Sequence, residues 1–138
     1  MNMVNKEEVK QILHSSEGET GKVVGLDEVA INEILREIKN RIVRSFNPMR
    51  IVLFGSYASG IPNEDSDLDL LVVMESNESP IKRTARVSKI FRDRKLPMDI
   101  IVRTPQEIRS RLDVGDFFIK EILEEGKILY ERDSKGMG

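Results

Sequence analysis

The sequence predicts one α/β domain, because strand and helix patterns alternate along a chain of single-domain length. The chain has 138 residues, of which 39% are hydrophobic and 33% are charged, a composition typical of a soluble globular protein. Short apolar runs bounded by turn residues alternate with segments in which apolar residues recur at helical spacing.

The first long helix is expected at residues 26–46. Apolar residues recur there every three or four positions, which predicts one face directed into a core. They are Val29, Ile31, Ile34, Leu35, Ile38, Ile42 and Phe46. Asn47 and Pro48 end the helix. Residues 1–25 are expected to form a flexible N-terminal appendage with a short helix at 6–13, since the stretch SSEGETGKVVG is rich in turn formers.

The centre of the chain holds two strand candidates on either side of a turn. The first covers residues 50–54 and leads directly into Gly55 and Ser56. The second begins after Asp67, in the run LDLLVVM. Because successive side chains of a strand point to opposite faces, the carboxylates of Asp67 and Asp69 are expected to project to the same side.

The rest of the chain continues the alternation. The other expected elements are a short helical turn at 57–60, a helix from 80 to about 94, a strand around Asp99, helices at 104–112 and 116–125, and a strand over KILYE. Gly126 stops the last helix. Residues 133–138 are expected to be a disordered tail, so the domain spans residues 26–132.

Three aspartates suggest a site for metal and phosphate. Adjacent carboxylates repel each other, and Mg²⁺ is the simplest neutraliser for oxygen ligands. Mg²⁺ usually brings a substrate phosphate, which Gly55 and Ser56 could receive through close backbone approach and a hydroxyl group. If the strands of Asp67 and Asp99 are neighbours, three carboxylates converge, as a two-metal site for phosphoryl transfer requires.

The order and spacing of these residues match a known family. The matching positions are Gly55, Ser56, a spacer at 57–66, Asp67, Asp69 and Asp99. Over about residues 26–130 the chain resembles the minimal nucleotidyltransferases, small members of the DNA polymerase β-like nucleotidyltransferase superfamily. The resemblance implies the nucleotidyltransferase fold, a small mixed β-sheet with helices packed on one side. One departure is Ser59, where many relatives carry Arg.

The resemblance also implies a role for each matching residue. Asp67 and Asp69 are expected to bind the metal ions. Asp99 is expected to assist the second metal and to act as the base toward an acceptor hydroxyl. The expected nucleotide-binding residues are Gly55, Ser56 and Tyr57. The ring of Tyr57 either stacks on a base or shields the turn beside the Gly-Ser pair.

The implied reaction is transfer of a nucleoside monophosphate, AMP from ATP, to a hydroxyl group with two Mg²⁺ ions and release of pyrophosphate. Small relatives of this kind resemble antitoxins that modify a tyrosine of a HEPN-domain toxin partner. Two alternatives stay open: a non-catalytic partner-binding module of the same fold, and an aminoglycoside-type transferase acting on small molecules. A homo-oligomer could also build the acceptor site between subunits.

Composition excludes several other classes. No apolar run approaches the roughly 20 residues of a spanning helix, and the N-terminus lacks the apolar segment of a signal peptide. With no cysteine and no sign of secretion, a cytoplasmic location is expected. A net charge of −2 disfavours a nucleic-acid partner, which would need a basic surface.

Two groups of side chains have competing interpretations. The helix expected at 80–94 is strongly basic, and its charges either bind triphosphate, RNA or an acidic partner or form a solvated face, with the solvated face favoured. They are Lys82, Arg83, Arg86, Lys89, Arg92, Arg94 and Lys95. Near the end of the chain, an apolar group is expected to be core rather than an exposed partner patch. It consists of Phe117, Phe118, Ile122 and Leu123.

Overall fold

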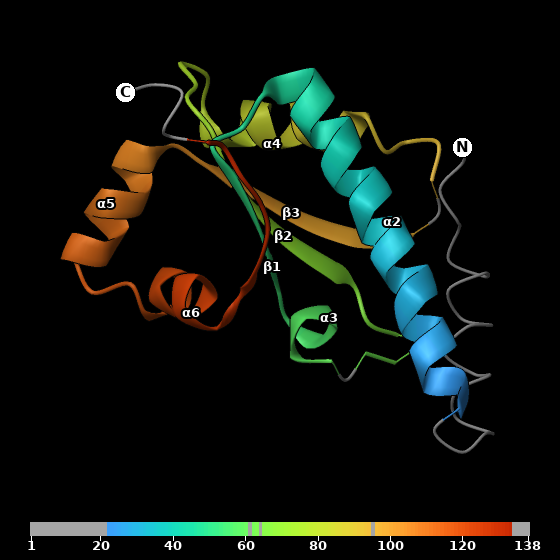
Figure 1. Ribbon diagram of the computed structural model, residues 1–138. Helices are drawn as coiled ribbons and strands as arrows, with labels where there is room; N and C mark the ends of the chain where they lie inside the picture. Colours follow the sequence, from blue (N-terminus) through green and yellow to red (C-terminus); the bar gives the residue numbers. More distant parts are fainter. Residues whose placement is uncertain (1–21, 61, 64, 95, 134–138) are drawn as a thin grey trace.

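The computed structural model describes residues 22–133 apart from 61, 64 and 95. Figure 1 labels the helices and strands of this part of the chain. In order they are α2 (Lys22–Phe46), β1 (Arg50–Phe54), α3 (Ser56–Ser59), β2 (Leu68–Val73), α4 (Pro80–Lys89), β3 (Met98–Arg103), α5 (Pro105–Asp113), α6 (Phe117–Glu125) and β4 (Lys127–Glu131). The short helix expected at 6–13 and the tail at 134–138 lie outside the described residues.

The four strands form one mixed sheet in the order β3-β2-β1-β4. Strand β1 is antiparallel to both β2 and β4, whereas β2 and β3 are parallel. A parallel pair needs a crossover connection, which α4 supplies here between β2 and β3. The small mixed sheet expected from the sequence is therefore confirmed.

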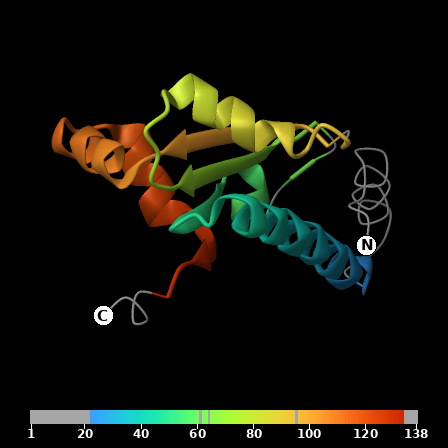
Figure 2. The same cartoon turned by 90° about the horizontal axis from the view of Figure 1, so that it is seen from above.

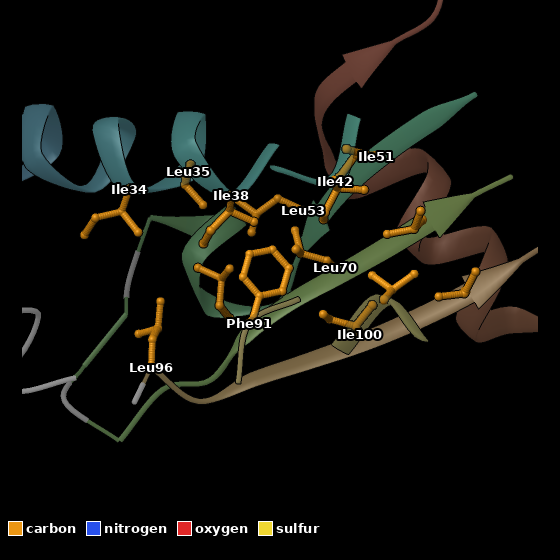
Figure 3. Packing of buried hydrophobic residues seen from close by; sticks show 14 of the residues in the cluster. Ile34, Leu35, Ile38, Ile42, Ile51, Leu53, Leu70, Phe91, Leu96 and Ile100 are labelled. Carbon is orange, nitrogen blue, oxygen red and sulfur yellow. The ribbon is translucent and has the colours of Figure 1, made fainter. Parts of the chain in front are cut away.

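The larger hydrophobic core lies between one face of this sheet and the helices α2 and α4. Figure 3 shows Ile38 and Ile42 of α2 packed against the sheet residues Leu53 and Leu70. All four of these side chains are fully buried. Phe91, just after α4, joins the same cluster. The core-facing stripe predicted for the first helix is confirmed from Ile31 onward.

Helices cover both faces of the sheet, which corrects the expectation that they pack on one side. Val52, Leu71 and Val73 point to the face opposite the larger core and are buried with Ile122 of α6. In Figures 1 and 2, α5 and α6 lie on the opposite side of the molecule from α2. The runs IVLF and LDLLVV are almost continuously apolar, so both faces of β1 and β2 need cover.

Helix α2 differs from expectation in its start and in the exposure of one residue. Helix α2 begins at Lys22, four residues earlier than predicted, so residues 22–25 belong to the helix and not to the appendage. A single glycine inside a helix, Gly25, costs only about 1 kcal/mol, so it does not stop this one. Val29 is 54% exposed although the pattern placed it in the core, because the core contacts of α2 begin at Ile31.

Helix α4 ends at Lys89, not near residue 94. The chain tightens there, since the amides of Ile90, Phe91 and Arg92 each bond to a carbonyl three residues back. The expected start is confirmed: Ser79 caps the helix by accepting a hydrogen bond from the amide of Lys82.

The aromatic pair that opens α6 is exposed, which corrects its assignment to the core. Phe117 is 79% and Phe118 is 52% exposed. Asp116 caps the helix by accepting from the amide of Ile119, and the helical period then turns Ile119 and Ile122 toward the sheet. Phe117 lies on another side of the helix, whereas Phe118, four residues before Ile122, lies at the edge of the buried face and contacts Phe54 of β1.

An ion pair between the buried Arg83 and the partly exposed Glu107 joins α4 to α5. Arg83 is 3% exposed, so it is not part of the solvated basic face expected for this helix. Its guanidinium group donates to both carboxylate oxygens of Glu107 and to the carbonyl of Val102. Glu107 also closes the first turn of α5, because it accepts from the amide of Thr104 while its own amide donates to the Thr104 hydroxyl.

This arrangement predicts a specific acid sensitivity. The hydrogen bond from Arg83, opposed in part by burial, lowers the pKa of Glu107 from 4.5 to about 2. The stabilisation is therefore complete above pH 4.5 and is lost as the pH falls toward 2. The Glu107 side chain is 34% exposed. A shift of this size corresponds to about 3 kcal/mol without screening, which solvent reduces to about 1 to 2 kcal/mol.

The Glu107→Gln variant is expected to lose about 2 kcal/mol of unfolding free energy at pH 7, and the difference from wild type should disappear near pH 2. Urea unfolding at several pH values measures both effects. Glu78→Gln is the matched control, because Glu78 pairs with the exposed Arg86 and should contribute less than about 1 kcal/mol. Equal losses in the two variants would contradict the assignment.

Within residues 22–133, apart from the three omitted positions, no helix is both long enough and apolar enough to cross a membrane.

Candidate active site

The strand register brings two of the three predicted aspartates side by side. On the parallel strands β2 and β3, Asp69 is the direct partner of Asp99. On the other side of β2, Asp69 is opposite Phe54 of β1. A row therefore crosses three strands in the order Asp99, Asp69, Phe54. Strand alternation places it on the face that α6 covers, since Leu71 and Val52, two residues from Asp69 and Phe54, belong to the cluster on that face.

Asp67 completes the group from the loop just before β2. Burial raises the pKa of Asp69, and the negative charges of Asp99 and Asp67 raise it further. Asp69 is therefore close enough to both Asp99 and Asp67 for its charge to be repelled by each. A site that concentrates negative charge in this way favours a cation.

The donor set fits Mg²⁺. Carboxylate oxygens are its preferred protein ligands, and Mg²⁺ takes one or two of them together with water and phosphate oxygens. Among the described residues, no three acidic or histidine side chains are gathered into a complete metal-binding group. Mg²⁺ bound by these carboxylates would take further ligands from water and phosphate oxygens.

The turn after β1 holds Asp69 in place and requires glycine. Gly55 has φ 76°, a conformation that L residues with side chains rarely adopt. A Cβ atom at Gly55 would lie 2.2 Å from Oδ2 of Asp69. The carboxylate therefore rests directly against the backbone of the Gly-Ser turn, so Gly55, predicted to bind phosphate, and Asp69, predicted to bind metal, lie next to each other.

A hydroxyl pair fastens this turn to the loop that carries Asp67. Oγ of Ser56 lies 3.1 Å from Oγ of Ser66, the residue before Asp67. Ser66 Oγ also accepts from the amide of Asn63. Sequence reasoning missed Ser66. Its place immediately before the Asp-x-Asp pair is the signal that could have indicated it.

Tyr57 lies on the other side of this turn. Its ring is half-buried against the larger core. Burial raises the pKa of its hydroxyl, and the charge of Asp67 adds to the effect. Tyr57 is not among the described residues that line the cleft beside Asp69. This position favours a shielding role over base stacking.

A cleft of about 710 Å³ opens beside Asp69, between α3 and α6. Its lining includes Phe54, Gly55, Asp69, Phe118, Glu121 and Glu125. Figure 1 shows α3 and α6 at the same end of the sheet. A second cavity of about 800 Å³ lies beside Arg50 and Ile108, and none of the predicted site residues is among its described lining. Chemistry, not size, therefore identifies the candidate active site.

The family described as the nucleotidyltransferase domain matches residues 35–129. The chain belongs to this family. The match covers more than half of the chain, from α2 to β4, and contains every predicted site residue. The nucleotidyltransferase is thus an enzyme of the class that transfers nucleotidyl groups.

Two relatives of the nucleotidyltransferase come from Methanocaldococcus jannaschii, and their names describe them as candidate protein adenylyltransferases. One is 34% identical over 119 residues, which cover 79% of this chain and 78% of the relative. The other is 28% identical over 104 residues, which cover 75% of this chain and 98% of the relative.

Two solved structures share the fold. The crystal structure of a candidate nucleotidyltransferase from Sulfolobus solfataricus has a TM-score of 0.56 and 22% identity, covering 82% of this chain and 91% of the other. A toxin-antitoxin structure determined with AMP-PNP has a TM-score of 0.52 and 21% identity, covering 74% and 77%. These similarities support the fold.

Proposed function

We propose that this nucleotidyltransferase uses Mg²⁺ to transfer AMP from ATP to a hydroxyl group of a protein, a tyrosine of a HEPN-type toxin partner, and thereby acts as an antitoxin. The observation that carries the proposal is the position of Asp69, which is the register partner of Asp99 on one side and lies against the Gly55 turn on the other. An acid pair next to a close backbone turn is the arrangement that a metal-bound triphosphate requires.

Each residue then has a chemical task. Asp67 and Asp69 would hold the metal ions, which when bound supply charge neutralisation at the phosphates. Gly55 and Ser56 would bind the triphosphate through the backbone and a hydroxyl. Asp99 would accept the proton of the acceptor hydroxyl. The acceptor oxygen forms a bond to the α-phosphorus of ATP, and the bond from that phosphorus to pyrophosphate breaks.

A protein acceptor is supported by the names of the two M. jannaschii relatives. The toxin-antitoxin structure with AMP-PNP supports an adenine nucleotide and an antitoxin role. In this proposal the partner protein brings the acceptor hydroxyl to Asp99.

The decisive experiment begins with calorimetric titration of ATP into the protein with and without Mg²⁺. Binding is expected only with Mg²⁺, and the double variant Asp67→Asn, Asp69→Asn should abolish it. Labelled ATP is then incubated with the protein and its cognate HEPN partner, and the partner tyrosine should become labelled. Failure of ATP to bind under any condition would favour a non-catalytic binding module. Labelling of small hydroxyl compounds in place of the partner would favour the aminoglycoside-type alternative.

A further inference from the structure

One wall of the cleft beside Asp69 is aromatic. The rings of Phe54 and Phe118 contact edge to face, with centroids 5.7 Å apart and planes at 84°. Phe118 is 52% exposed although α6 is anchored by the buried Ile119 and Ile122. An exposed aromatic ring on a well-anchored helix, beside a polar site, indicates a binding surface.

The row of side chains across the sheet indicates on which side of Asp69 the donor and the acceptor would bind. Asp99 lies on one side of Asp69, and Phe54 lies on the other. The acceptor belongs on the Asp99 side, where its proton is taken. The cleft between Phe54 and Phe118 is therefore on the donor side of the acid pair.

The charge and size of the side chains that line the cleft indicate where the phosphates and the nucleoside of a bound nucleotide would lie. Glu121 and Glu125 line the α6 side, where they would repel phosphates and accept hydrogen bonds from nucleoside hydroxyl or amino groups. Opposite them, the α3 side is lined by the small side chains of Ala58 and Ser59. The phosphates thus belong at Gly55 and the nucleoside toward α6.

We infer that Phe118, supported by Phe54, is the stacking surface for the nucleobase of the donor nucleotide. The inference rests on the proposed function and adds the residue that binds the base. Stacking uses the flat face that every base has, so it tolerates different bases. The aromatic wall would strengthen the binding of all nucleoside triphosphates and leave inorganic triphosphate unaffected.

The test compares two neighbouring phenylalanines. Phe118→Ala is expected to weaken Mg²⁺-dependent binding of ATP and of CTP about tenfold, measured by calorimetry. Inorganic tripolyphosphate should bind wild type and variant equally. Phe117→Ala is the matched control: Phe117 is 79% exposed, is not among the described residues lining the cleft, and has the ammonium group of Lys120 5.9 Å from its ring centroid.

Further variants distinguish stacking from simple apolar contact. Phe118→Leu should weaken ATP binding, and Phe118→Trp should retain or strengthen it, with unchanged thermal unfolding in both. Equal effects of the Phe117 and Phe118 variants, or an equal loss for tripolyphosphate, would overturn the inference. Unchanged ATP binding with impaired transfer would also overturn it and assign the wall to the acceptor. If the wild-type protein binds tripolyphosphate and binds no nucleoside triphosphate more tightly, the stacking surface is refuted. If the wild-type protein binds neither tripolyphosphate nor nucleotides, both the stacking surface and the proposed function fail.

Discussion

Replacing Asp69 with Asn is expected to lower the rate of nucleotidyl transfer by about a thousandfold or more while the protein remains folded. The carboxylate of Asp69 lies between Asp99 and the Gly55 turn, so its charge would hold the metal at the centre of the site. Asn has the same shape but lacks that charge. Transfer of label from ATP to the partner measures the loss.

Although the Asp69→Asn variant should lose activity, its stability should stay the same or increase. Because burial and the charges of Asp99 and Asp67 raise the pKa of Asp69, its ionised form destabilises the fold in the absence of metal. This penalty is present above the unfolded pKa and vanishes at lower pH, where the group is protonated in both states. The Asp69→Asn variant should therefore unfold at the same temperature as wild type or higher at pH 7 without Mg²⁺.

Asp65→Asn is the control for this prediction. Asp65 is an exposed acid in the same loop, two residues before Asp67. Its replacement should leave both transfer and unfolding temperature close to wild type. A large loss of transfer in the Asp65 variant, or an active Asp69 variant, would remove Asp69 from the metal-binding role.

The second large effect is expected from Gly55→Ala. The new Cβ would lie 2.2 Å from Oδ2 of Asp69, so either the carboxylate or the turn must move. A displacement of about 1 Å in a catalytic group can cost about a hundredfold in rate. We therefore expect at least that loss in transfer, together with weaker Mg²⁺-dependent ATP binding.

Gly60→Ala is the control for a positive φ without a steric clash. Gly60 has φ 83° and ψ 13°, the left-handed conformation, and a Cβ there would meet nothing within 4 Å. Gly60→Ala should lose about 1 to 2 kcal/mol of stability. Gly55→Ala should lose more, because φ 76° and ψ −157° lie in a region that only glycine adopts readily and because the new Cβ meets Asp69. Chemical unfolding and transfer assays measure the two effects. Similar activities in the two variants would show that contact with Asp69 is unimportant.

Much of the fold follows from local patterns in the sequence. The period of three to four residues in α2 and the apolar runs of β1 and β2 determined which segments are helix and strand, because burying one helical face or a continuous strand needs that spacing. The family could also be predicted locally. The spacing of the Gly-Ser pair and the Asp-x-Asp pair predicted a nucleotidyltransferase, which the family match confirms, and a metal and phosphate site, which stays a prediction.

The tertiary structure decided how these parts meet. The sequence could propose that Asp69 and Asp99 are close, but strand order and register, which depend on long-range packing, make them direct partners. It could not show that the apolar second face of the sheet draws α6 over it. That packing buries Ile119 and Ile122 and leaves Phe118 at the cleft, although all three side chains are hydrophobic. Hydrophobicity selects residues for burial, but the position of the neighbouring sheet determines which of them is buried.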